Sequence, residues 1–320
     1  KIHAAWAVPG GVRSPLSAEL RDQIRTGLPE AFAISLDALR LFKQLLDQQL
    51  GEELEVFGQF PSLFVGLVGG DGTWEHSSGA DCKGIRVMAS DGSLVADGLQ
   101  EEHYADFLAE AVEPWSYLKF PYFKALGPEA GSYRVGPLAR LNLCDRIGTE
   151  RADGELLELR QRGGRVVTAS FLYHLARLIE ILACLEQMEQ LLDDPEITAT
   201  HVRARASVNC QEAVGVSEAP RGTLLHHYRV DAHGLIERVN LIIATGQNNS
   251  AMNRTITQIA KHYLDGNRIT EALLNRVEAG IRCFDPCLSC STHAAGQMPL
   301  LVQLFNAEGE LLQQHRRDQP

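Results

Sequence analysis

The sequence predicts a mainly α-helical fold, a helical bundle with small β-hairpin inserts. Several long stretches carry apolar residues at helical spacing, which is typical of amphipathic helices. Three shorter stretches carry a glycine-containing turn between two β-type runs, which is typical of hairpins. No internal repeat, low-complexity tract or linker divides the 320 residues, so we expect one domain with a large core.

Two helices are expected near the start of the chain. Ser17 is placed to cap the first, and Pro29 suits the first turn of the second. After Pro29, apolar residues recur every three or four positions and form one stripe. The members of this stripe are Phe32, Leu36, Leu39, Phe42, Leu46 and Leu50.

Further helices are predicted from residues 101–112, 168–192, 250–265 and 270–283. Residues 168–192 are apolar almost all round, so this helix belongs in the middle of a bundle. Residues 113–165 are rich in aromatic residues, glycine and proline and show no clear period. We expect them to be irregular structure packed on the core.

Residues 64–68 are a short apolar run before a glycine-rich turn and predict one strand. Residues 85–97, 224–244 and 300–315 each predict a hairpin. The three turns are expected at Asp91-Gly92, His233-Gly234 and Glu308-Gly309.

The composition is that of a soluble globular protein, with 45% hydrophobic and 22% charged residues. The net charge of −11 argues against a nucleic-acid-binding surface as the main function. No stretch approaches the roughly 20 apolar residues of a membrane span. Seven cysteines, most of them isolated, indicate a reduced compartment, and we expect a cytoplasmic protein.

A cysteine-rich segment near the end of the chain carries the strongest chemical signal. Cys283, Cys287, Cys290 and His293 follow one another at intervals of three or four residues. Such spacing suits a zinc site, a three-cysteine iron–sulfur site, a redox dithiol or another soft-metal site. Cysteines that merely pack in the core are a further alternative, and Cys283 falls at the end of an amphipathic helix, as buried cysteines often do.

The segment 285–293, Asp-Pro-Cys-Leu-Ser-Cys-Ser-Thr-His, resembles the C-terminal signature D-P-C-x-x-C-x-x-H of the large, catalytic subunit of nickel–iron hydrogenases. Residues 218–253 begin with Glu-Ala-Pro-Arg-Gly and resemble another segment of the same family. The stretches 1–12, 116–124 and 133–142 also fit in family order. The resemblance is strongest to the soluble, NAD-reducing branch.

This resemblance implies a nickel ion held by four thiolates, two of which bridge to an iron that carries cyanide and carbonyl ligands. Cys287 would then be a terminal nickel ligand, and Cys290 would bridge nickel and iron. His293 would bind magnesium or a similar cation beside the site. The sulfur of Cys287 would also be able to accept a proton during cleavage of H2.

The resemblance also implies roles for residues of two other segments. Arg221, next to Pro220, would hold its guanidinium over the open side of the metals, with Asp285 as its carboxylate partner. Pro220, Thr245 and Gly246 would line the cofactor.

In the family a serine or threonine hydroxyl donates to a cyanide ligand, and this position corresponds to Gly246. Thr245 or Gln247 is expected to compensate.

Two departures from the family pattern stand out. The family's other two nickel ligands lie in an R-x-C-G-x-C motif toward the N-terminus, and this motif is absent here. Residues 1–293 therefore resemble the C-terminal part of a large-subunit domain, and we expect them not to assemble the complete centre alone. Residues 294–320 resemble a propeptide that a maturation endopeptidase removes after nickel insertion.

The resemblance implies a hydrogenase catalytic subunit that splits H2 reversibly and passes electrons to NAD+. The implied partners are a small iron–sulfur subunit, diaphorase subunits that hold FMN and NAD, and nickel chaperones. The alternatives are a zinc-stabilised helical binding protein and a non-catalytic, hydrogenase-like interaction subunit.

Overall fold

The structure is a computed structural model that describes residues 6–8, 10–48, 50–79, 81–116, 118–204, 210–264, 266, 268–287 and 300–317. The α-helices of these residues are α1 (Ala18–Gln48), α2 (Gly51–Val56), α3 (Tyr104–Phe107), α4 (Gly127–Ala130), α5 (Pro137–Leu143), α6 (Glu150–Gly163), α7 (Tyr173–Asp193), α8 (Ala244–Gln247), α9 (Asn249–Tyr263) and α10 (Glu271–Cys283). Short 3-10 helices are η1 (Glu101–His103), η2 (Lys124–Leu126), η3 (Ser170–Leu172) and η4 (Pro195–Thr198).

The strands form a four-stranded sheet, a three-stranded sheet and three separate hairpins within the described ranges. The four-stranded sheet has the order β5–β4–β3–β8, and the three-stranded sheet has the order β11–β10–β9. The strands are β1 (Ala7–Val8), β2 (Gly11–Val12), β3 (Leu63–Gly69), β4 (Cys82–Ala89), β5 (Leu94–Leu99), β6 (Leu108–Val112), β7 (Lys119–Phe123), β8 (Tyr133–Arg134), β9 (Glu212–Ala219), β10 (Gly222–Val230), β11 (Ile236–Ile242), β12 (Leu300–Phe305) and β13 (Leu311–Arg317).

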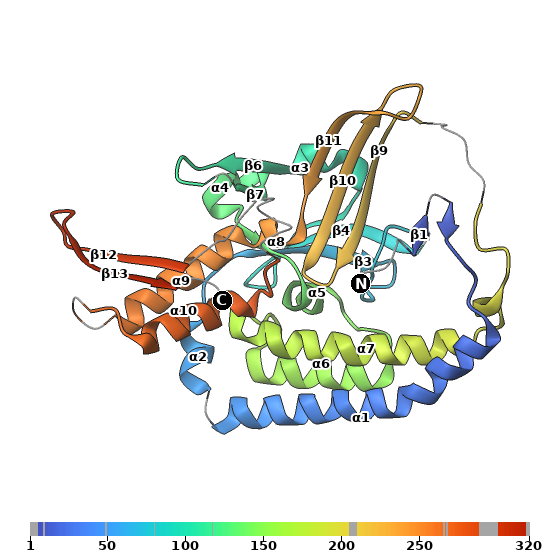
Figure 1. Cartoon of the computed structure of the whole chain (residues 1–320), viewed down its shortest axis with the longest axis horizontal. Helices are drawn as coiled ribbons and strands as arrows, with labels where there is room; N and C mark the ends of the chain where they lie inside the picture. Colours follow the sequence, from blue (N-terminus) through green and yellow to red (C-terminus); the bar gives the residue numbers. More distant parts are fainter. Residues whose placement is uncertain are drawn as a thin grey trace.

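Three long helices, α1, α6 and α7, run side by side along one side of the molecule (Figure 1). Helix α7 lies between the other elements and contributes the largest share of the helical core, including Leu175, Ile179 and Leu182. The sequence expectation for α7 is confirmed in kind, although the α-helix begins at Tyr173, after η3. The helical layer is thus built around one helix that is apolar on most of its faces.

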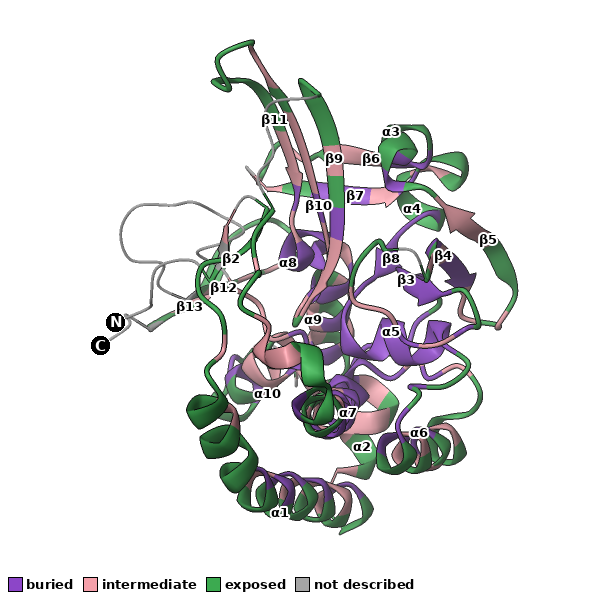
Figure 2. Cartoon of the chain, turned by 90° about the vertical axis from the view of Figure 1, so that its right-hand side faces the viewer, coloured by how far each residue is buried: buried purple, intermediate pink, exposed green. Residues whose placement is uncertain are grey.

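Helix α5 joins the helical layer to the four-stranded sheet. All seven of its residues are buried, and it packs on β3 and on α7. Pro137 begins the helix, where its missing N–H costs no hydrogen bond. Strand β3 is likewise buried at each of its seven positions, so this part of the fold has protein on both sides of the sheet. Figure 2 shows α5 and β3 as the buried centre of the molecule.

Arg134 is buried beside the same sheet without a carboxylate partner. Its guanidinium lies 4.8 Å from the ring centres of both Phe60 and Phe64. Its N–H groups donate to the Ser62 and Ser170 hydroxyls and to the carbonyls of Gly58, Phe60 and Thr168. Burial lowers the pKa of Arg134 to about 10.

Two sequence expectations for the first helices are wrong. Helix α1 is one continuous helix that contains Pro29, not two helices that meet there. The buried face runs through Leu28 and Phe32 on both sides of the proline, so packing outweighs the local cost of the lost N–H. Leu36 is 40% exposed and does not belong to this face.

The expected helix at residues 101–112 is also wrong over its second half, which is strand β6 paired with β7. The expected irregular segment 113–165 contains β7, α5 and α6. Helix α6 buries only three residues on a polar helix, Ala152, Leu156 and Leu159, so its period is weak in the sequence. The description "mainly α" holds only in part, because the sheets make up a substantial second layer.

The three predicted hairpins are confirmed as β4–β5, β10–β11 and β12–β13. The predicted helices at 250–265 and 270–283 are confirmed as α9 and α10. Ser17 accepts a hydrogen bond from the Leu20 N–H at 3.1 Å, as expected of a helix cap.

The C-terminal hairpin β12–β13 contacts the loop before α10 through one side chain. The Ile269 N–H donates to Gln313 Oε1 at 2.7 Å, and Gln313 Nε2 donates to the Ile269 carbonyl at 3.3 Å. The amide of Gln313 therefore pairs with the backbone of Ile269 as a neighbouring strand would.

Candidate functional site

Arg221 lies in the tight turn between β9 and β10. Ala219 pairs with Gly222, so Pro220 and Arg221 form a two-residue turn. A Cβ on Gly222 would lie 2.3 Å from the Val135 side chain, and one on Gly136 would lie 2.7 Å from the Arg221 carbonyl. Both glycines also have positive φ, so the turn can approach residues 135–136 only because neither position has a side chain.

A buried arginine, Arg140 on α5, fixes the position of this turn. Its guanidinium donates to both carboxylate oxygens of Glu180 at 2.7 Å and to Glu218 at 2.8 Å. It also donates to the carbonyls of Ala219 at 2.9 Å and Pro220 at 3.4 Å. Burial acts against the charge, but the two carboxylates outweigh it and raise the pKa of Arg140.

The two carboxylates are themselves saturated with donors. Glu218 accepts from the Leu67 N–H at 3.0 Å and from the Thr223 hydroxyl at 2.8 Å. Glu180 accepts from Trp74 Nε1 at 3.2 Å. This network joins β3, α5, α7 and the β9–β10 turn, and every charge in it has a partner.

Arg221 pairs with the residue that follows α10. Its Nε donates to the Asp285 carbonyl at 2.5 Å and lies 3.3 Å from the Asp285 carboxylate. The side chains are 37% and 43% exposed, so the pair lies at the surface of the described chain. Asp285 has φ +48°, a left-handed conformation that Asp tolerates better than most residues.

Helix α7 supports the end of α10. Arg177 Nη2 donates to the Cys283 carbonyl at 3.2 Å, and the Phe284 ring packs on Tyr173 with centroids 5.1 Å apart. Cys283 is buried, and burial raises the pKa of its thiol to about 12. It is therefore a packed, protonated thiol, as its place at the end of an amphipathic helix suggests.

Thr245 connects α8 to the metal-ligand segment. It is buried, and its hydroxyl oxygen accepts a hydrogen bond from the Cys287 N–H at 3.2 Å. A threonine hydroxyl carries one hydrogen, so the O–H of Thr245 remains able to donate.

Two neighbours of Thr245 hold α8 in place. The Tyr133 hydroxyl donates to Gln247 Oε1 at 2.8 Å, and Gln247 Nε2 donates to the Thr223 carbonyl. The Val135 N–H donates to Asn248 Oδ1 at 3.0 Å, and Asn248 Nδ2 donates back to the Val135 carbonyl at 3.3 Å. The side chain of Gln247 is thus occupied by the protein itself.

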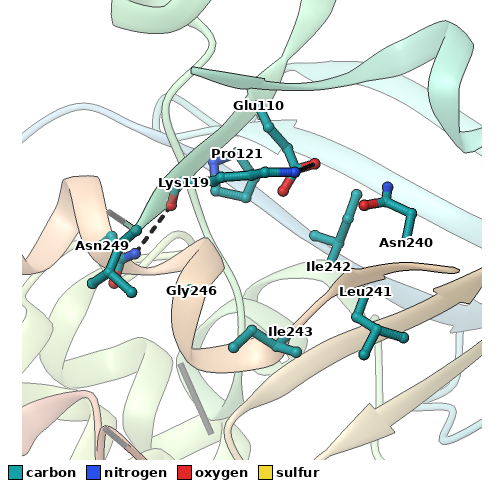
Figure 3. A pocket seen from close by; sticks show the side chains of 10 residues that line it. Glu110, Lys119, Pro121, Asn240, Leu241, Ile242, Ile243, Gly246 and Asn249 are labelled. Carbon is teal, nitrogen blue, oxygen red and sulfur yellow. Dashed lines mark hydrogen bonds and ion pairs between the residues drawn. The ribbon is translucent and has the colours of Figure 1, made fainter. Parts of the chain in front are cut away.

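A cavity of about 260 Å³ lies beside α8 and reaches Gly246 (Figure 3). Its polar lining includes Glu110, whose carboxylate lies 3.1 Å from the Lys119 ammonium. Asn249 Nδ2 donates to the Lys119 carbonyl at 3.1 Å. Asn240 Nδ2 donates to the Tyr104 hydroxyl at 3.0 Å, which leaves the amide oxygen of Asn240 as its unused acceptor.

The structure brings together four of the residues that the sequence singles out: Arg221 with Asp285, and Thr245 with Cys287. Cys290 and His293 lie outside the described residues. Within the described ranges no three His, Cys, Asp or Glu side chains form a group that could hold a metal ion. The described donor, the soft sulfur of Cys287, is of the type that suits nickel or iron.

Sequence reasoning missed the supporting network of Arg140, Glu180 and Glu218. A signal was present, because Arg140 and Glu180 interrupt strongly apolar stretches that become a buried helix and the central helix. A charge in such a stretch indicates a buried partner of opposite sign. Which charges pair across 40 and 78 residues of sequence depends on the tertiary fold.

The chain belongs to the nickel-dependent hydrogenase family, whose family model matches residues 88–293. It is 41% identical over 327 residues to the NAD-reducing hydrogenase HoxS subunit beta of Cupriavidus necator, an alignment that covers 99% of this chain and 66% of the relative. It is 36% identical over 312 residues to the vhc F420-non-reducing hydrogenase of Methanococcus voltae, covering 96% of this chain and 65% of that protein.

The fold agrees with this assignment. The crystal structure of an NAD+-reducing [NiFe]-hydrogenase in the H2-reduced state superimposes with a TM-score of 0.84 at 42% identity, covering 90% of this chain and 63% of that one. A Ni-Fe-Se hydrogenase from Desulfovibrio vulgaris Hildenborough shares the fold with a TM-score of 0.65 at 19% identity, covering 89% and 63%. The chain therefore spans about two thirds of the length of these relatives.

Family membership decides between the alternatives for the cysteine segment in favour of the nickel-dependent hydrogenases. Among the residues that the structure describes, no helix has the length and apolar character needed to span a membrane.

Replacement of Arg140 tests the buried network. In Arg140→Met both carboxylates lose their buried partner, and we expect the free energy of unfolding to fall by about 3–5 kcal/mol. Arg140→Lys keeps the charge but not the planar fork, so its loss should be smaller. Urea unfolding measures both values. A loss below about 1 kcal/mol in Arg140→Met would contradict the proposed support of the turn.

His174, beside Arg177 on α7, gives a pH-dependent prediction. Burial against Phe42 and Phe171 lowers its pKa to about 4, the nearby Arg177 charge lowers it further, and Asp285 acts in the opposite direction. The folded state therefore favours neutral His174, and its stability contribution is complete above the usual pKa of about 6.5 and is lost as the pH falls toward 4.

We expect wild type to lose about 2 kcal/mol between pH 7.5 and pH 5.0 through this group. Urea unfolding at both pH values should show a correspondingly smaller loss in His174→Phe. His233→Gln, in the exposed β10–β11 turn, is the matched control and should keep the wild-type pH dependence. Equal losses in wild type and His174→Phe would contradict the prediction.

Proposed function

We propose that this chain provides the catalytic part of a nickel–iron hydrogenase large subunit that cleaves H2 reversibly, with electrons passing to NAD+. The pairing of Arg221 with Asp285, beside the Cys287 backbone held by Thr245, carries the proposal. These residues bring a cation, a carboxylate and a soft ligand to one place. The 41% identity to an NAD-reducing hydrogenase subunit supports the choice of electron acceptor.

Cys287 and Cys290 would hold the nickel–iron group, with Cys287 on nickel and Cys290 between the two metals. When bound, this group supplies a soft, electron-rich centre at which H2 can be split. The described donor fits that role, because thiolates prefer soft metals. Two further thiolates would have to come from outside the 320 residues, since the sequence lacks R-x-C-G-x-C.

Arg221 would polarise H2 and orient it, and would take part in moving the proton. Its hydrogen bond to the Asp285 carbonyl fixes the guanidinium at Nε and directs its remaining N–H groups. The Asp285 carboxylate balances its charge and is placed to assist as a base. The sulfur of Cys287 is the alternative proton acceptor on this chain.

Pro220, Thr245 and Gly246 would line the cofactor. The Thr245 hydroxyl already accepts from the Cys287 N–H, so its own hydrogen can be donated to a cyanide nitrogen. Gln247 is the weaker candidate for this role, because its amide nitrogen donates to the Thr223 carbonyl. Gly246 has no hydroxyl, and Thr245 would compensate for it.

His293 would bind magnesium or a similar cation. The cavity beside Gly246 supports a cation nearby, because Glu110 and Asn240 provide the oxygen atoms that hydrated magnesium prefers.

The proposed partners are a small iron–sulfur subunit, diaphorase subunits that hold FMN and NAD, and the nickel chaperones of maturation. A cytoplasmic location accompanies this assignment. The relation to one subunit of the NAD-reducing hydrogenase HoxS supports a multi-subunit complex.

Residues 294–320 would be a propeptide, and residues 1–293 the C-terminal part of the large-subunit domain. The position of β12–β13 supports this division, because few contacts besides those of Gln313 join the hairpin to other elements. A maturation endopeptidase would cut between His293 and Ala294.

Substitution of Arg221 in the native complex tests the reaction. In Arg221→Lys the planar guanidinium is lost, and we expect the rate of H2-dependent NAD+ reduction to fall by about 100-fold or more at unchanged nickel content. Arg229→Lys, which alters an exposed ion pair on the same strand, is the matched control and should keep full activity. Wild-type activity in Arg221→Lys would refute the assigned role.

Loss of a metal ligand has a separate readout in the same complex. Cys287→Ser should remove stoichiometric nickel and the infrared bands of bound CO and cyanide, because a hydroxyl is a poor ligand for soft metals. Retention of nickel and of both infrared bands would exclude Cys287 as a ligand.

Mass spectrometry of the native protein tests the tail. We expect the mature large subunit to end at His293. A mature chain that still contains β12–β13 would show that residues 294–320 are a permanent part of the protein.

A further inference from the structure

Helix α1 carries a second apolar stripe that packs against none of the other described elements. We call it the outer stripe of α1. Its members alternate at intervals of four and three residues: Leu20, Ile24, Gly27, Ala31, Ile34, Ala38, Leu41 and Leu45. Because each residue turns the helix by about 100°, these positions share one face over the whole length of α1.

The outer stripe differs from the face of α1 that packs on α7. That inner face consists of the buried residues Leu28, Phe32, Ser35, Leu39 and Leu46. In the outer stripe, Ile34 is 63% exposed and Leu41 is 58% exposed. Figure 2 shows α1 with one buried and one exposed side. A contiguous row of large apolar side chains facing water indicates a contact surface.

The spacing of the outer stripe indicates the shape of what covers it. A strict seven-residue repeat is the pattern by which two helices pack knobs into holes. Gly27, Ala31 and Ala38 alternate with the large residues, so the backbone of a second helix can approach closely. An added Cβ at Gly27 would meet nothing within 4 Å.

A hollow continues this surface toward the centre of the molecule. A cavity of about 410 Å³ lies between α1, α7 and α10, and its apolar lining includes Phe42, Leu178 and Ile181. Phe42 lies on α1 between the inner face and the outer stripe. A helix laid along the stripe would therefore also close the groove between α1 and α7.

The charges beside the stripe indicate the partner's edge. Glu30 and Asp37 each immediately precede a stripe residue, and both are exposed. In a pair of helices these flanking positions face the flanks of the partner. A partner with Lys or Arg along the facing edge is complementary to them.

We propose that the outer stripe of α1 receives an α-helix from the third of the hydrogenase large subunit that has no counterpart among these 320 residues. The helix is amphipathic, with apolar residues at heptad spacing and basic residues along one edge. The relatives have about a third of their length outside the aligned part. The proposal rests on family membership and not on the proposed reaction.

Thiol accessibility in the native complex tests the proposal. Ile34→Cys lies in the outer stripe, and Leu36→Cys lies on the same helix outside it and is the matched control. We expect maleimide to label Ile34→Cys at least about tenfold more slowly than Leu36→Cys in the native complex. In the isolated 320-residue chain the two rates should be similar. Peptide mass spectrometry separates these thiols from the natural cysteines.

Equal labelling of the two variants in the native complex would overturn the proposal. A short thiol-reactive cross-linker at Ile34→Cys then identifies the occupant. A cross-linked peptide of the large subunit from outside the 320 residues, with apolar heptads, is the expected product. A peptide from a second copy of α1 or from another subunit would overturn the assignment. No metal is needed for these readouts, so they stand or fall independently of the H2 reaction.

Discussion

The buried guanidinium of Arg140 is the interaction on which the rest of the site depends. It lies between Glu180 of α7 and Glu218 of β9, and it also holds two carbonyls of the β9–β10 turn. An ion pair of this kind is strongly destabilising when one partner is removed, because the remaining charge stays buried. The position of Arg221 is therefore tied to the integrity of the whole interior.

A second principle of the site is that polar side chains substitute for backbone pairing. Gln247 and Asn248 hold the short helix α8 against residues 135 and 223, and Arg177 binds the carbonyl at the end of α10. The two segments that carry Thr245 and Cys287 belong to no common sheet or helix. Their relative position is set by these directional contacts, which allow little adjustment.

The sequence predicted those parts of the fold that have a local cause. Hairpins with glycine turns and the helices α9 and α10 follow from short-range pattern, and the segment 285–293 identified the family. The continuity of α1 through Pro29 depends on packing against α7 and could not be inferred locally. The same holds for Arg140, whose partners lie far away in the sequence, whereas Arg221 and Asp285 were found through motifs.

The contact between Gln313 and Ile269 has a consequence for how the C-terminal hairpin is retained. Two amide hydrogen bonds together contribute about 1–3 kcal/mol, which between separate molecules corresponds to an affinity weaker than millimolar. The covalent chain supplies the high effective concentration that keeps such a weak contact formed. A break in the backbone between Ile269 and Leu300 would turn it into a bimolecular contact, and the hairpin would diffuse away without being pulled off.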